Sequence, residues 1–435
     1  MSAIVARPRR ARDIAAARAA AMAELSDGLF TGLVFAVVAA YFCVSDMVLT
    51  NIGINYAEGG GNPLEKIHPG TWLAFTALLL MGLRRGNPLR LIDVVAAFRG
   101  VALFMLAWSM LCVWVIAITK VPFTPLVDTF LAAIVVFLLI SELEPPAMRK
   151  LALMVHALMT INACVGVVEY ATGWRLTPYT IGSTAIDTDW RSTAILGHPL
   201  GNAALTGSYV VALTVGGARD LPRWLRPLAL ALQLVAMIAF GGRSSLANAL
   251  VMISGVGIWR LSRLARGQSF DKVAAATVFL VAPVVVALVA AASIGGFFTQ
   301  FVERLSDDAG SGKTRLIMLT FFDMIPLRDI VFGPDSAYVA SLQAQEGIEL
   351  GIESFFVGFV LAHGALMASV FFLGLFAFCW QIARQTRPST WLVLLFYFIV
   401  ASTSVSLSVK TITFAVFVSM TLSIMRPARV GEAST

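Results

Sequence analysis

Long apolar runs limit what this chain can fold into. Many of them have about 17–25 residues, enough for a helix to cross about 30 Å of hydrocarbon. Only 13% of the 435 residues are charged, whereas a soluble domain averages about 25%. Inside lipid, each backbone polar group must find its hydrogen bond within the protein, so these runs predict transmembrane helices. They are too apolar to be the strands of a membrane barrel.

The sequence therefore predicts an all-α polytopic membrane protein with about twelve transmembrane helices. The expected spans are 28–49, 67–83, 100–119, 122–141, 150–169, 199–217, 226–241, 244–262, 273–295, 354–380, 390–408 and 411–425. The second, seventh and twelfth are short. The four cysteines are dispersed among the spans and indicate neither a disulfide framework nor a metal site.

Lysines and arginines are concentrated in every second connecting segment of such a bundle. If the N-terminus is cytoplasmic, 22 of the 32 lysines and arginines fall in cytoplasmic segments and 10 fall outside. This bias predicts cytoplasmic termini and explains the net charge of +7 without nucleic-acid binding. The stretch before Asp27 has no apolar core of a signal peptide.

The expected organisation is a basic cytoplasmic tail (1–26), an integral membrane helical domain (27–425) and a second cytoplasmic tail (426–435). The membrane domain contains one long extracytoplasmic loop, 297–353. Within that loop, Lys313–Ile325 is mostly apolar and is followed by Pro326, which predicts a short helix at the membrane surface.

Three arginines lie on the outer side, each close to the start of a helix: Arg191, Arg243 and Arg315. Because the positive-inside bias disfavours basic residues there, a shared anionic ligand such as a lipid diphosphate would explain them. Each also has a simpler interpretation. Arg191 can be an ordinary loop residue, Arg243 can reach lipid headgroups, and Arg315 can pair with Asp307 or Asp308 on a solvated face.

Two of these arginines sit in recognisable local patterns. Gly241–Ser245 reads as a tight turn in which Ser244 or Ser245 caps the next helix and directs its free N–H groups towards Arg243. Arg191 begins a segment ending in His198 and Pro199, and a proline fits the first turn of the sixth span. His198 is either structural or a contact to substrate.

An acidic residue opens the tenth span. Ser354 is a plausible N-cap, and Glu353 before it suits the positive end of the helix dipole. The alternative is that Glu353 is a general base, since sugar transfer needs a group that takes the proton of the acceptor hydroxyl. His363, further along the span, fits helix packing as well as chemistry.

Two other classes of site are disfavoured. Ser311–Thr314 looks like part of a phosphate-binding loop, but Asp307 occupies the place of the required first glycine. Ionisable residues within the spans are few and lie near span ends: Asp46, Asp128 and Glu169. An ion-coupled transporter usually places such groups near the midplane of the membrane.

Taken in order, these motifs resemble the O-antigen ligase and O-antigen polymerase superfamily of bacterial membrane glycosyltransferases, across about residues 160–380. The family's first pattern, an arginine followed by small residues and His/Asn-Pro, matches Arg191 to Asn202. Its second, a Ser/Gly-Arg-Ser/Gly turn, matches Gly242-Arg243-Ser244.

The later motifs match less completely. Arg315, Pro326-Leu327 and Phe332-Gly333 fit the loop motif, but Pro334-Asp335 departs from its usual glycine. The last motif has a histidine in ligases, and here Glu353 stands at that place.

The resemblance implies a GT-C-like fold and a bacterial inner-membrane enzyme. It implies an undecaprenyl-diphosphate-linked glycan donor, a saccharide acceptor outside the cytoplasm, inversion at the anomeric carbon and neither metal nor cofactor. Arg191, Arg243 and Arg315 would bind the diphosphate and Glu353 would be the base. A chain-length regulator protein is a further expected partner.

An acid at position 353 favours a polymerase of exopolysaccharide or O-antigen repeats over a ligase that uses lipid A-core. A polysaccharide flippase or exporter is the alternative from another class, and a non-catalytic membrane scaffold is the remaining one.

Overall fold

The computed structural model describes residues 6–57, 60–84, 89–119, 123–181, 184–186, 189–267, 311–348, 351–404 and 407–427, and a few isolated positions between 272 and 290. The regular secondary structure of this part of the chain is helical except for two paired strands, β1 (Thr180–Ile181) and β2 (Thr184–Ala185), which run antiparallel with Thr180 opposite Ala185. The helical prediction is therefore confirmed for the described residues.

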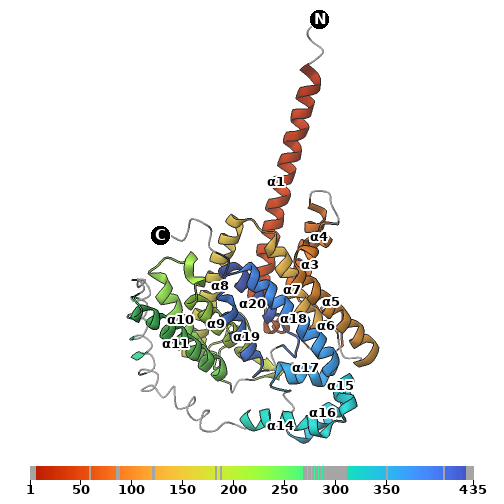
Figure 1. The fold of residues 1–435 in the computed structure, drawn as a ribbon, viewed down its shortest axis with the longest axis vertical. Helices are drawn as coiled ribbons and strands as arrows, with labels where there is room; N and C mark the ends of the chain where they lie inside the picture. Colours follow the sequence, from red (N-terminus) through yellow and green to blue (C-terminus); the bar gives the residue numbers. More distant parts are fainter. Residues whose placement is uncertain are drawn as a thin grey trace.

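Figure 1 shows how the described helices are arranged along the chain. The first half of the chain forms α1 (Ala6–Cys43), α2 (Asp46–Asn51), α3 (Pro69–Leu83), α4 (Arg90–Ala97), α5 (Arg99–Trp114), η2 (Val115–Thr119), α6 (Thr124–Leu126), η3 (Val127–Leu131), α7 (Ala132–Ser141) and α8 (Pro145–Thr172). The second half forms α9 (Pro199–Thr214), η4 (Gly217–Asp220), α10 (Leu225–Ala239), α11 (Arg243–Ala265), α14 (Ser311–Met324), α15 (Leu327–Phe332), α16 (Ser336–Gln345), α17 (Phe355–His363), α18 (Ala365–Gln385), α19 (Thr390–Ala401) and α20 (Thr413–Ile424).

Several helices are long and apolar enough to cross a membrane. Among the described residues there are six such segments: Glu24–Cys43, Arg99–Ile118, Thr124–Ser141, Pro145–Thr172, Arg243–Arg263 and Ala365–Gln385. Four shorter apolar helices, α3, α10, α19 and α20, coincide with further expected spans. The expected ninth span, 273–295, lies outside the continuously described residues. The helices are thus compatible with a membrane protein, and the total of twelve spans stays a prediction.

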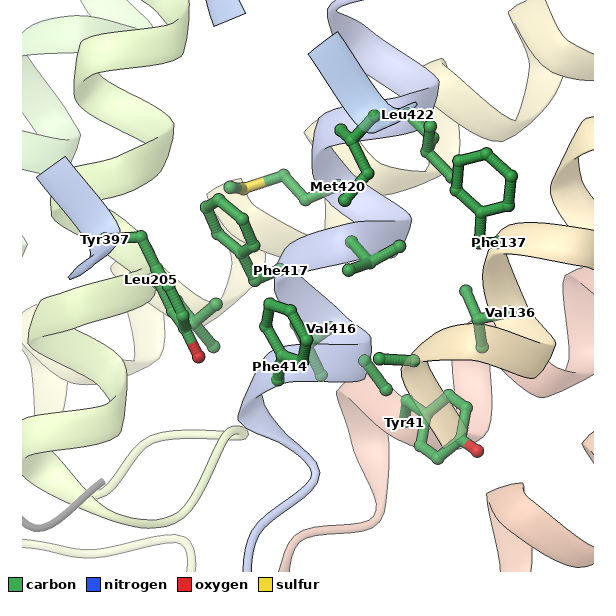
Figure 2. Close-up of a cluster of buried hydrophobic side chains, with 14 of the residues drawn as sticks. Tyr41, Val136, Phe137, Leu205, Tyr397, Phe414, Val416, Phe417, Met420 and Leu422 are labelled. Atoms are coloured by element: carbon green, nitrogen blue, oxygen red, sulfur yellow. The ribbon is translucent and has the colours of Figure 1, made fainter. Parts of the chain in front are cut away.

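Helix α20 forms the centre of the bundle. Every residue from Phe414 to Ile424 is buried, as expected for a helix that is apolar on all sides. Figure 2 shows its side chains packed between four other helices, with labelled contacts from Tyr41 of α1, Val136 and Phe137 of α7, Leu205 of α9 and Tyr397 of α19. The hydroxyl of Ser419 donates to the carbonyl of Ala415 at 2.7 Å, so this polar group is satisfied within the helix.

The connecting segments gather at two ends of the bundle. At one end Arg84 pairs with Asp27, Arg426 pairs with Asp220 and Arg260 donates to the carbonyl of Thr214. These residues lie in segments expected in the cytoplasm or in the ends of spans next to such segments, and we call this the inner end.

At the opposite end, the outer end, Lys410 donates to the carbonyls of Tyr56 and Lys66. Helices α14–α16 also lie away from the N-terminal helix (Figure 1). The described connections named here thus lie at two opposite ends, and the orientation of these ends in a membrane stays a prediction.

The expected tenth span, 354–380, is not one helix. It is divided into α17 and α18 at Gly364, which has φ +81°. A Cβ at this position would lie 2.4 Å from the backbone nitrogen of Gly333, so the break allows the end of α15 to pack closely on the junction. His363 is buried at the end of α17, and its carbonyl accepts a hydrogen bond of 2.9 Å from Trp114 Nε1.

Part of the long outer loop forms a small helical unit. The expected helix Lys313–Ile325 is confirmed as α14, which ends before Pro326, and α15 and α16 follow it. The unit has its own apolar core of Met318, Phe321, Ile325, Val339, Leu342, Ile348, Ile352 and Leu361. Residues 297–310 of the expected loop lie outside the described residues.

Candidate functional site

The segment Arg191–His198 at the outer end is a fixed structure rather than a solvated loop. Glu169, near the end of α8, is only 2% exposed. Its carboxylate accepts hydrogen bonds from the backbone N–H groups of Leu176 (2.8 Å), Thr193 (2.9 Å) and Ala194 (2.8 Å). A buried carboxylate with three backbone donors is well satisfied, so Glu169 holds the segment in place.

Two asparagines reinforce this arrangement. The Asn162 side-chain oxygen accepts from the N–H groups of Ile195 (3.1 Å) and Leu196 (3.2 Å), and its Nδ2 donates to Asn202 Oδ1 at 2.8 Å. Asn202 in turn donates to the carbonyl of Thr193 at 2.7 Å. Helices α8 and α9 therefore hold the segment from both sides, and no local sequence pattern pointed to Asn162.

Arg191 is held in a fixed orientation at the start of this segment. Its Nε lies 3.0 Å and 2.9 Å from the two carboxylate oxygens of Asp189, and its Nη2 lies 2.5 Å from Oδ2. The guanidinium also lies over the ring of Tyr179, 5.9 Å from its centroid. Two of the three guanidinium nitrogens are thus engaged by Asp189, a partner that the sequence analysis did not identify.

The turn before Arg243 packs directly against Arg191. A Cβ at Gly241 would lie 2.6 Å from Cγ and 2.7 Å from Cδ of Arg191, and the N–H of Ser192 donates to the carbonyl of Ala239 at 3.1 Å. Gly241 has φ +67°, which confirms the expected tight turn. The structure thus brings the Arg191 side chain to within two residues of Arg243.

The start of the next helix differs from the expectation. We expected Ser244 or Ser245 to be the N-cap, but α11 already begins at Arg243, and the N–H of Leu246 donates to the carbonyl of Gly242 at 2.9 Å. The two serines therefore lie in the first turn. The cause is the close approach of Gly242 to α9, because a Cβ there would lie 2.3 Å from the Cβ of Ala203.

Arg175 is a further arginine near this site. Its Nη1 donates to the carbonyl of Ile186 at 3.3 Å, and its charge, like that of Arg191, acts on Tyr179. The only sequence signal for Arg175 is that it is a basic residue on the expected outer side, where the positive-inside bias disfavours one. Arg315 lies in α14, but its side chain falls outside the described residues, as do Asp307 and Asp308. A meeting of Arg315 with the other arginines stays a prediction.

His198 is the N-cap of α9. Its Nδ1 accepts from the N–H of Leu200 at 3.2 Å, Pro199 occupies the first helical turn as expected, and the ring lies edge-on to Tyr179 with centroids 5.8 Å apart. Burial, assisted by the charge of Arg191, lowers the pKa of His198 to about 4. The imidazole is therefore neutral at pH 7.

Glu353 stands immediately before helix α17 and is half-buried. Ser354 is confirmed as the N-cap, since its Oγ accepts from the N–H of Val357 at 3.4 Å. The position is compatible with either interpretation of Glu353, a helix-start acid or a base, and its role stays a prediction.

The other ionisable residues noted in the sequence lie at the outer end. Asp128 is fully buried and accepts hydrogen bonds from the hydroxyls of Tyr56 (2.9 Å) and Thr71 (2.7 Å) and from the N–H of His68. Lys410 Nζ lies 3.9 Å from its carboxylate. This satisfied network ties α3 and η3 to the α19–α20 connection and explains Asp128 structurally.

Ser311–Thr314 form the first turn of α14 rather than a loop after a strand, which agrees with the rejection of a phosphate-binding loop.

Comparison with known proteins gives no match: no protein-family model, no curated protein and no solved structure is significantly similar to this chain.

Proposed function

We propose that this protein is a membrane glycosyltransferase that polymerises undecaprenyl-diphosphate-linked saccharide repeats at the outer face of a bacterial inner membrane. In this proposal, the reducing-end sugar of one lipid-linked chain is transferred to a hydroxyl of another lipid-linked saccharide, with inversion at the anomeric carbon. The C–O bond to the diphosphate breaks, a new glycosidic bond forms, and undecaprenyl diphosphate leaves.

The observation that carries the proposal is the contact between Arg191 and the Gly241–Arg243 turn. It places one arginine side chain against the N-terminal turn of α11, and the dipole of this helix adds positive potential at the same place. Arg175 adds a further positive charge around Tyr179. Such a concentration of donors at the outer end suits a leaving diphosphate, and arginines with helix N-termini can stabilise it without a metal.

We assign the following roles to the individual residues. Arg191, Arg243 and Arg315 bind the diphosphate. Asp189 holds Nε and Nη2 of Arg191 and so fixes the orientation of this guanidinium beside the proposed ligand. Glu353 takes the proton of the attacking hydroxyl, since carboxylates can serve as general bases in such reactions.

The test is to delete the gene and profile the lipid-linked glycans of the cell. Single repeat units accumulating on undecaprenyl diphosphate are expected for a polymerase. Long chains that remain unattached would indicate a ligase instead, and lipid-linked material trapped on the cytoplasmic side would indicate a flippase.

Complementation with Arg243→Lys sharpens this test. The variant keeps the charge but loses the planar fork that grips phosphate oxygens bidentately, so we expect it to restore long chains poorly compared with wild type. Full restoration would argue against Arg243 as a diphosphate ligand.

A further inference from the structure

A second polar feature lies at the outer end, beside the arginines. A pocket opens between α2, α9 and α20, and its polar lining includes Asp46, Tyr56, His198, Thr411 and Thr413. Its wall is continuous with the fixed segment, because a Cβ at Gly197 would lie 3.1 Å from Asp46 Oδ1. The proposed diphosphate site does not account for this pocket.

His198 is one of two histidines that cap helices in the same way. In His68-Pro69 and His198-Pro199 the Nδ1 atom accepts a backbone N–H two residues later, at 3.0 Å from Gly70 and 3.2 Å from Leu200. Because Nδ1 is the acceptor, the proton of each neutral ring resides on Nε2.

The two Nε2–H groups differ in what they meet. His68 Nε2 lies 2.5 Å from the carbonyl of Val44 and is satisfied by the protein. His198 Nε2 has no hydrogen-bond partner among the described residues, and His198 lines the pocket. The Nε2–H group of His198, unlike that of His68, is therefore available as a donor to a ligand in the pocket.

Asp46 supplies the complementary acceptor. Its Oδ1 accepts the N–H of Met47 at 2.9 Å, and within the described part of the chain no cation lies within ion-pair distance of it. Asp128, by contrast, is surrounded by hydroxyl, N–H and ammonium donors.

The chemistry of the pocket suits the hydroxyl groups of a sugar. An N–H donor and a carboxylate acceptor together match the oxygen acceptors and hydroxyl donors of a saccharide. The carboxylate repels a diphosphate, which is better placed at the arginines. Tyr179 lies between the two regions, since its ring centroid is 5.9 Å from Arg191 Cζ and 5.8 Å from the centroid of His198.

We propose that this pocket binds the acceptor saccharide, with His198 Nε2–H donating to one sugar oxygen and Asp46 accepting from a hydroxyl. The word acceptor rests on the proposed transferase function, whereas saccharide binding by the pocket does not. The α19–α20 connection links the pocket to α17, because Thr411 and Thr413 line the pocket and a Cβ at Gly358 would lie 3.0 Å from Ser408 Oγ.

The experiment measures two affinities on the full-length protein in lipid nanodiscs. One ligand is the repeat-unit oligosaccharide released by mild acid from the producing cell's lipid-linked glycans, and the other is undecaprenyl diphosphate. The variants are His198→Asn, Asp46→Asn and the matched control His68→Asn. Asparagine is a good N-cap, so both histidine replacements keep a cap on their helix.

We expect His198→Asn and Asp46→Asn each to weaken oligosaccharide binding about tenfold and to leave binding of undecaprenyl diphosphate unchanged. His68→Asn should lower the unfolding temperature, because Val44 loses its donor, and should bind the oligosaccharide like wild type. The proposal is overturned if either of the two pocket variants binds the oligosaccharide normally, if they lose both ligands equally, or if wild type does not bind the oligosaccharide.

The same measurements separate this inference from the proposed function. Wild-type protein that binds the oligosaccharide through His198 and Asp46, yet elongates no chains, would support the pocket and overturn the polymerase. If the wild-type protein elongates chains while both pocket variants keep full affinity for the oligosaccharide, the polymerase proposal is supported and the pocket proposal is overturned.

Discussion

Glu353 can be tested as a single residue because its neighbour, not its own side chain, caps α17. We expect Glu353→Gln to fold normally and to bind the lipid-linked donor, but to elongate chains about 10²–10⁴ times more slowly, as is typical when a general base is lost. The measurement is the elongation rate of purified protein. Glu346→Gln, an acid at the end of α16, is the control. An unchanged rate in Glu353→Gln would leave Glu353 as a helix-start residue favoured by the dipole.

Glu169 is the residue whose loss should most disturb the arginine segment. In Glu169→Gln one oxygen becomes an NH₂ group, which cannot accept the N–H of Leu176 if the other oxygen keeps Thr193 and Ala194. Hydrogen bonds to charged groups contribute about 1.5–3 kcal/mol, so we expect a loss of about 2 kcal/mol in stability. Thermal unfolding of purified protein measures it, with the exposed Glu144→Gln as control. Equal unfolding temperatures for Glu169→Gln and wild type would contradict the role assigned to this carboxylate.

The sequence predicted the local structural roles of single residues better than it predicted their hydrogen-bond and ion-pair partners. Pro199 in a first turn and Ser354 as an N-cap are local patterns, and both are confirmed. The roles of Glu169 and Asn162 depend on backbone groups that lie 7 to 34 positions away in the chain, so no local pattern reveals them. Asp189 is only two residues from Arg191, and proximity in sequence was the one available sign of that ion pair.

At the scale of elements, the contact between Arg191 and the Gly241 turn is the feature to perturb. Gly241→Ala adds a methyl group 2.6 Å from Arg191 Cγ at a backbone φ of +67°. Gly173→Ala is a matched control at the outer end, with φ +72° and no atom within 4 Å of the added carbon. Both should lose about 1–2 kcal/mol of stability from backbone strain.

Only Gly241→Ala should also weaken binding of undecaprenyl diphosphate, because it displaces the Arg191 side chain. Titration of the two purified variants with this lipid compares them directly. Similar affinities in both would show that the packing of Arg191 on the turn does not position a diphosphate ligand.

Helix boundaries show where sequence reasoning stops at this scale. The end of α14 was predictable because Pro326 cannot continue a helix. The break at Gly364 was not, because glycine is tolerated inside apolar helices and the reason for the break is the backbone of Gly333, which belongs to another element. The early start of α11 has the same kind of cause, the packing of Gly242 on Ala203.

For the whole molecule, the fold separates the connecting segments into an inner and an outer end, and the charge bias predicts which end faces the cytoplasm. Arg223 lies in an exposed connection at the inner end, and Ala340 lies on the exposed surface of α16 at the outer end. In a cysteine-free background, we expect Ala340→Cys to react with a membrane-impermeant thiol reagent in cells whose outer membrane has been permeabilised. Arg223→Cys should react only after the inner membrane is also opened.

This pair decides between the two orientations because each position serves as the control for the other. Labelling of Arg223→Cys but not Ala340→Cys in intact inner membranes would reverse the orientation. It would place Arg191, the Arg243 turn and the His198 pocket in the cytoplasm. A donor already moved to the outer leaflet would then be out of reach, and both the polymerase proposal and its acceptor pocket would fail together, whatever the contacts within the outer end.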